Sequence, residues 1–132
     1  MIAYVDTSAA AKLLVEEAES AVLATELDRL VAAGARPTSS ALLETELRRL
    51  AVRIDAEQAL VSDLLDHFDL VGVDTVIVRS AGLLPGRGLR SLDALHVATA
   101  MQVDAELVIS YDARQAAAAR AAGLRVVSPA AG

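Results

Sequence analysis

The stretch MIAYVDTSAAAK, residues 1–12, places a carboxylate between two expected elements of secondary structure. Residues 2–5 are an uninterrupted apolar run, which predicts a short buried strand, and the alanine-rich residues 8–15 predict a helix. Asp6 stands between them, although a carboxylate is one of the costliest groups to remove from water. Taken alone, Asp6 is explained as the N-cap of the helix, where aspartate is favoured. Similar placements of acids later in the chain raise a second possibility.

The composition indicates one domain with a substantial core. The chain has 132 residues, of which 55% are hydrophobic, and it has no cysteine. The lack of cysteine excludes disulfides, zinc–thiolate sites and thiol nucleophiles, and it fits a reducing cytoplasm. The N-terminus does not resemble a signal peptide, and no apolar run approaches the roughly 20 residues that span a bilayer. We therefore expect a cytoplasmic protein that does not insert into membranes.

The charge balance argues against a broad nucleic-acid-binding surface. The formal net charge is −6, whereas phosphate contacts require Lys and Arg. The three aromatic residues, Tyr4, Phe68 and Tyr111, are too few to form a platform for stacking bases. The net charge is an average, however, and acids gathered around a cation do not repel an RNA as free acids would.

Strands and helices alternate along the chain. The expected strands or extended segments are 2–5, 35–40, 68–73, 107–110 and 124–127, and the expected helices are 8–15, 18–33, 41–53, 55–67, 74–84, 91–103 and 113–122. Gly34 and Gly123 follow two of the helices and suit their C-terminal ends. The apolar strand runs lack a period of two, which favours a parallel sheet covered by helices on both faces. The expected fold class is therefore α/β, with three layers and a central, mainly parallel sheet.

Two further aspartates lie where helices begin. Asp112 follows residues 107–110 as Asp6 follows residues 2–5, and it can likewise be a cap. Asp93 lies in the first turn of helix 91–103, where a negative charge favours the helix dipole. Each position has a sufficient structural explanation when it is considered alone.

Glu46 is harder to explain as an ordinary surface residue. The expected core stripe of helix 41–53 consists of Leu43, Leu47, Leu50 and Ile54. Glu46 borders that stripe. Its neighbour Glu44 is four residues before Arg48, a spacing that suits an exposed ion pair.

The topology brings these acids together. Parallel strands end at one edge of the sheet, and ligands bind outside those ends, so Asp6 and Asp112 share an edge. The helices that carry Glu46 and Asp93 can lean over the same edge. Two carboxylates about 4 Å apart repel by roughly 4 kcal/mol at an effective dielectric near 20. A hard cation such as Mg²⁺ or Mn²⁺ would relieve this repulsion.

Four motifs, in this order and spacing, resemble PIN-domain ribonucleases of the VapC toxin type, from type II toxin–antitoxin systems. They are YVDTSAAAKL (4–13), SSALLETELRR (39–49), RSLDALHVATA (90–100) and VISYDAR (108–114). The resemblance covers nearly the whole chain and implies one PIN-like α/β/α domain over residues 1–132. By position it implies that the catalytic, metal-binding acids are Asp6, Glu46, Asp93 and Asp112, with Ser8 and Ser110 as supporting hydroxyls.

The resemblance also implies a function. Members of this family cut single-stranded or looped RNA with Mg²⁺ or Mn²⁺, which activates a water molecule. A toxin of this kind pairs with a cognate antitoxin protein, and a homodimer is expected. Arg87 and Arg90, in the loop before Asp93, and Arg49 are candidates for contact with RNA phosphate.

Several alternatives stay open at this point. His96, three residues after Asp93, is either a catalytic group or, as we favour, a buried histidine with satisfied hydrogen bonds. A phosphoacceptor receiver domain would use Asp74, which follows residues 68–73, but the paired acids and the late-strand lysine of that class are missing. A haloacid-dehalogenase-like phosphatase would need an aspartate where Ser8 stands. A non-catalytic binding module with the same fold is the remaining alternative.

Overall fold

The computed structural model describes residues 1–130, and every expected element occurs within them, with ends shifted by a few residues. The elements are β1 (Ile2–Val5), α1 (Thr7–Leu14), α2 (Ser20–Ala32), β2 (Arg36–Ser40), α3 (Leu42–Ile54), α4 (Gln58–Leu65), β3 (Asp69–Val71), α5 (Thr75–Leu83), α6 (Ser91–Gln102), β4 (Leu107–Ile109), α7 (Ala113–Ala121) and β5 (Val126–Val127). Residues 131–132 of the expected domain lie outside the described part of the chain.

The five strands form one sheet in the order β3-β2-β1-β4-β5, and every pairing is parallel. The central strand β1 pairs with β2 on one side and with β4 on the other, and Tyr4 lies opposite both Thr38 and Val108. The backbone N–H of Asp6 continues this ladder by donating to the carbonyl of Ile109 at 3.2 Å. The carboxyl ends of β1 and β4 are therefore direct neighbours.

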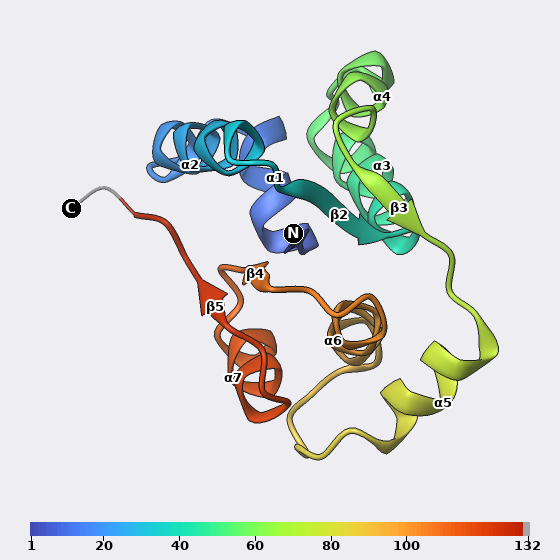
Figure 1. Cartoon of the computed structure of the whole chain (residues 1–132). Helices are drawn as coiled ribbons and strands as arrows, with labels where there is room; N and C mark the ends of the chain where they lie inside the picture. The colour runs from blue at the N-terminus through green and yellow to red at the C-terminus, as the bar shows by residue number, and fades with distance from the viewer. Residues whose placement is uncertain (131–132) are drawn as a thin grey trace.

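Helices cover both faces of the sheet, as Figure 1 shows, so the expected three-layer α/β/α fold is confirmed. Ala3 and Val5 belong to a core cluster with residues of α1, α2, α3 and α4. Tyr4, between them in β1, belongs to a second cluster with residues of α6 and α7. This alternation follows from the period of two along a strand. It places Tyr4 on the face of the sheet that α6 covers.

The helix ends agree with the sequence signals. Gly34 and Gly123 adopt φ values of +96° and +89°, the left-handed region in which glycine carries no steric cost. The Ser40 hydroxyl accepts from the N–H of Leu42 at 3.1 Å as α3 begins. Asp74, on which a receiver-type interpretation depends, caps α5 by accepting from the N–H of Ile77 at 2.8 Å.

The expected core stripe of α3 was wrong in its second half. Leu43, Leu47 and Ala51 are fully buried, whereas Leu50 is half-buried and Ile54 is 46% exposed. Since α1 and α4 both pack against α3, the buried line follows the steps of four residues that lead to Ala51. Helical periodicity alone does not reveal which neighbours cover a helix.

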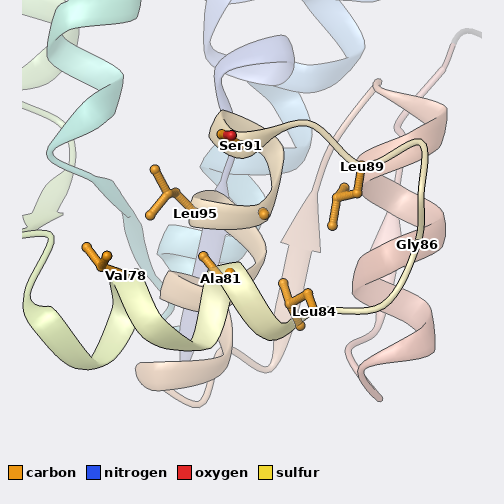
Figure 2. Close-up of a pocket in the computed structure, with 9 residues that line it drawn as sticks. Val78, Ala81, Leu84, Gly86, Leu89, Ser91 and Leu95 are labelled. Carbon is orange, nitrogen blue, oxygen red and sulfur yellow. The ribbon is translucent and has the colours of Figure 1, made fainter.

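A hollow of about 430 Å³ lies between α5, the loop that follows it and α6. Figure 2 shows Leu84, Leu89 and Leu95 around it, and none of the candidate acids lines it. Within residues 1–130, the helices are too short or too polar to cross a lipid bilayer.

Candidate metal-binding active site

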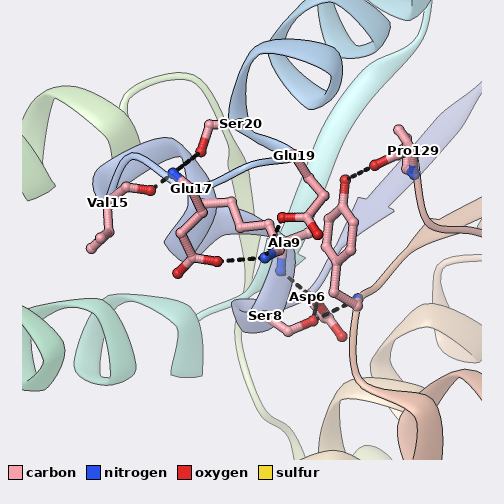
Figure 3. A network of polar contacts seen from close by, with 10 residues as sticks. Asp6, Ser8, Ala9, Val15, Glu17, Glu19, Ser20 and Pro129 are labelled. Carbon is pink, nitrogen blue, oxygen red and sulfur yellow. Dashed lines mark hydrogen bonds and ion pairs between the residues drawn. The ribbon is translucent and has the colours of Figure 1, made fainter. Parts of the chain in front are cut away.

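Asp6 is completely buried at the end of β1, and its carboxylate is held by hydrogen bonds. One oxygen, Oδ1, accepts from the Ser8 hydroxyl at 2.6 Å and from the N–H of Ala9 at 3.0 Å, while Oδ2 accepts from the Ser110 hydroxyl. Figure 3 shows Asp6 and Ser8 together at the start of α1. Burial raises the pKa of Asp6, and the bonds from Ser110 and Ser8 oppose that rise. Asp6 therefore caps the N-terminus of α1 and also lies at the edge of the sheet where the strands end.

The two serines connect Asp6 to the loop that carries Asp112. Ser8 accepts from the N–H of Tyr111 at 2.8 Å, and Ser110 accepts from the N–H of Asp112 at 3.1 Å. Each serine therefore donates to Asp6 and accepts from the segment after β4. Because of this double use, the backbone before α7 is fixed relative to the end of β1.

Asp93 and Asp112 line one open cavity of about 350 Å³, together with Arg90, Ala113 and Arg114. Asp93 lies in the first turn of α6, and Asp112 caps α7 by accepting from the N–H of Arg114 at 2.9 Å. Burial and the nearby negative charge of Asp112 raise the pKa of Asp93. The two carboxylates are thus close enough to repel each other.

Glu46 turns from α3 toward α6. Its side chain is 23% exposed, and its Oε1 atom lies 2.8 Å from Nε2 of His96. His96 is buried, with Nδ1 2.6 Å from the Tyr4 hydroxyl and Nε2 3.1 Å from the Thr7 hydroxyl. His96 is therefore a buried histidine with satisfied hydrogen bonds, as we expected, and one of its partners is a candidate site acid.

The arginines considered for contact with RNA divide into two groups. Arg90 and Arg114 are exposed and line the cavity that Asp93 and Asp112 share. Arg87 and Arg49 are exposed but do not line that cavity. Sequence reasoning missed Arg114, although its place two residues after Asp112, at the start of a helix, was a usable signal.

No group of three or more His, Cys, Asp or Glu side chains is close enough to enclose a metal ion within residues 1–130. The donors at the sheet edge are nevertheless carboxylates, the hard oxygen ligands that Mg²⁺ and Mn²⁺ prefer. Mg²⁺ usually keeps several waters and takes only one or two carboxylates from the protein. The pair Asp93 and Asp112, which share a cavity open to solvent, fits that requirement.

Comparisons with known proteins agree with this fold and its motifs. The family model described as "PIN domain" matches residues 3–121. The chain is 39% identical over 132 residues to ribonuclease VapC35 of Mycobacterium tuberculosis (strain ATCC 25618 / H37Rv), with 96% of each chain covered. It is 34% identical over 130 residues to ribonuclease VapC47 of Mycobacterium tuberculosis (strain CDC 1551 / Oshkosh), again with 96% of each covered.

Solved structures show the same fold at low sequence identity. A VapBC2 structure from Rickettsia felis, bound to a DNA fragment from its promoter, superimposes with a TM-score of 0.75 at 14% identity, covering 98% of this chain and 99% of that one. The sarcin–ricin-loop-cleaving toxin VapC20 of Mycobacterium tuberculosis superimposes with a TM-score of 0.72 at 20% identity, covering 96% and 99%.

Proposed function

The chain belongs to the PIN-domain family, among the VapC-type toxins, and from that premise we propose that it is a metal-dependent endoribonuclease that cuts single-stranded or looped RNA. The observation that carries the proposal is the cavity shared by Asp93 and Asp112, which Arg90 and Arg114 also line. It combines acids that suit a divalent cation with bases that suit phosphate.

The proposed ligands of Mg²⁺ or Mn²⁺ are Asp93 and Asp112, with Asp6 at the end of β1 and Glu46 of α3 as further proposed ligands. When bound, the cation supplies a water of lowered pKa and neutralises charge that develops on the phosphate. The protein's own part is to hold the carboxylates. Ser8 and Ser110 fix the Asp6 carboxylate, and Asp112 is fixed in turn by its capping bonds to α7.

Arg90 and Arg114 are the proposed contacts for the RNA backbone. Both are exposed beside the acids, so they would meet a phosphate that enters the cavity. Arg87, in the loop before α6, is proposed to extend this contact, and Arg49 is an outer candidate. A local group of arginines explains how a chain of net charge −6 would hold a polyanion.

The proposed setting is the cytoplasm, with a cognate antitoxin that blocks the site and a homodimer as the toxin's own assembly. Support comes from solved neighbours described as toxin–antitoxin pairs, among them the VapBC2 structure and a toxin–antitoxin complex from Klebsiella pneumoniae. An antitoxin would protect the host cell until the toxin is released.

Cleavage of a labelled single-stranded RNA pool by the purified chain tests the proposal. We expect cleavage with Mg²⁺ or Mn²⁺, none with EDTA, and a loss of at least 100-fold in Asp93→Asn, since each metal-binding or catalytic group contributes on the order of 10²–10⁴. Asp63→Asn is the matched control, because Asp63 is an exposed acid on α4. Binding of RNA without metal-dependent cleavage would instead identify a non-catalytic module.

A further inference from the structure

Three residues from three elements form a continuous hydrogen-bonded chain that ends at Glu46, one of the candidate site acids. Tyr4 of β1 bonds to Nδ1 of His96 in α6 at 2.6 Å, and Nε2 of His96 bonds to Glu46 of α3 at 2.8 Å. We propose that Tyr4 and His96 are positioning residues that hold the Glu46 carboxylate ready to receive the cation. The inference rests on the proposed function, because it assigns a task to two residues behind that site.

The hydrogen bonds in this chain have a definite direction. An ionised carboxylate only accepts, so Nε2 of His96 must donate its proton to Glu46. In a neutral imidazole the other ring nitrogen then accepts, so the Tyr4 hydroxyl must donate to Nδ1. The Thr7 hydroxyl, 3.1 Å from Nε2, is a second and longer contact of the same N–H. Tyr4 therefore selects the tautomer that Glu46 needs.

Burial makes the hydrogen-bonded chain rigid at Tyr4 and His96 and leaves Glu46 accessible to a ligand. Tyr4 is 0% exposed and His96 is 2% exposed, whereas the side chain of Glu46 is 23% exposed. The bond to His96 engages Oε1 of Glu46 and leaves Oε2 for a ligand. A glutamate on a helix loses side-chain freedom when it binds a cation, and this bond removes part of that freedom beforehand.

A purely structural histidine would not require this arrangement. Filling the space under α6 demands only shape and satisfied nitrogens, and the Thr7 hydroxyl is already within reach of Nε2. The direct bond to a half-buried carboxylate of another helix gives His96 an effect on Glu46 that packing does not supply. Outer partners of metal ligands typically change metal affinity by about 10–100-fold when they are removed.

Two substitutions of His96 separate positioning from packing. The amide of a glutamine reaches the place of Nε2, whereas that of an asparagine reaches only the place of Nδ1. We expect His96→Asn to weaken Mn²⁺ binding by about 10–100-fold, measured from the electron paramagnetic resonance signal of free Mn²⁺. His96→Gln should bind within a few-fold of the wild type. In a Glu46→Ala background, His96→Asn should change Mn²⁺ affinity no further.

The outcomes are distinct. If the wild type binds Mn²⁺ and cuts RNA, and His96→Asn does both equally well, the positioning role is refuted and the proposed function stands. The same holds if His96→Gln is no better than His96→Asn. If the wild type neither binds Mn²⁺ nor cuts RNA, the proposed function fails and this inference fails with it.

A measurement on the unmodified protein does not depend on how the variants fold. The chain has two histidines, so a ¹⁵N spectrum of histidine-labelled protein shows two imidazoles, and His67→Gln identifies the signals. We expect His96 to carry a proton at Nε2 and its Nδ1 resonance to shift in Tyr4→Phe. A neutral His96 protonated at Nδ1 would refute the assigned direction of the chain.

Discussion

The Ser110 hydroxyl donates a hydrogen bond to the buried carboxylate of Asp6 and so joins the ends of β4 and β1. A hydrogen bond to a charged group is worth about 1.5–3 kcal/mol when its loss leaves the charge buried. Ser110→Ala should therefore lower the free energy of unfolding by about that amount at pH 7, as measured by urea denaturation. Because the bond favours the ionised form of Asp6, the loss should shrink at a pH where Asp6 is protonated.

Ser80→Ala serves as the control for this measurement. Ser80 is a half-buried residue of α5, and alanine is the better helix former at that position. Its substitution should leave stability unchanged or slightly higher. An equal loss in the two variants would mean that the Asp6 bond contributes nothing specific.

Lys12, the only lysine of the chain, connects α1 to two other segments. Its Nζ lies 2.5 Å from Glu17, 3.1 Å from Glu19 and 4.8 Å from the centre of the Tyr111 ring. Figure 3 shows the side chains of Glu17 and Glu19 within this group of polar contacts. The hydrogen bond that Lys12 donates to Glu17 is the main cause that raises the pKa of Lys12, so the lysine is charged at neutral pH.

Replacing Lys12 should cost more than replacing an ordinary surface cation. Its side chain is 13% exposed, and it combines ion pairs with a cation–π contact, so Lys12→Met should destabilise the protein by about 1 kcal/mol. Arg29→Met, at an ion pair whose arginine is 64% exposed, should cost less, because solvent and salt screen that pair. Thermal melts at low and high salt measure both, and equal losses would contradict the prediction.

The sequence predicted the fold and the sheet-edge acids because both depend on local signals. Apolar runs mark the strands, Gly34 and Gly123 mark helix ends, and a parallel sheet places Asp6 and Asp112 at one edge. The residues that cap helices were also predictable, since capping involves only neighbours in the chain.

Such local signals do not predict contacts between segments that are far apart in the sequence. Glu46 and His96 are 50 positions apart, and their bond depends on how α3 packs relative to α6. The prediction that Ile54 is buried was wrong for the same reason, because burial depends on which elements cover each helix. Arg114 differs from these cases, because its position two residues after Asp112 is a local signal that could have placed it beside the acids.

The Asp93 carboxylate should lower the stability of the metal-free protein at neutral pH. Burial and Asp112 raise its pKa in the folded state. Its stabilising contribution is therefore complete below the unfolded pKa, near 3.9, and is lost as the pH rises through the folded value. Asp93→Asn, which is neutral throughout, should then melt above the wild type at pH 7 without metal, and the difference should vanish at acid pH.

Added Mn²⁺ should reduce that difference. A ligand that binds only the folded state stabilises it in proportion to the logarithm of its concentration over Kd, so the wild type should gain more than Asp93→Asn. Asp63→Asn controls for the general effect of removing one charge. A wild type that melts above Asp93→Asn without metal, together with no response to Mn²⁺, would show that Asp93 is only a helix-terminal acid.

Arg90 and Arg114 should control the affinity of the chain for RNA. Each neutralised phosphate of a single strand contributes about −0.7 to the slope of log affinity against log salt. Arg90→Ala and Arg114→Ala should therefore each weaken RNA binding and reduce that slope by about 0.7. Fluorescence anisotropy of a labelled RNA at several salt concentrations measures the RNA affinity and the salt slope. The Asp93→Asn background prevents cleavage during the measurement. Arg53→Ala, at an exposed arginine near the end of α3, should leave the slope unchanged. If it lowers the slope as much as the other two do, the RNA is held by general charge and not at the acidic cavity.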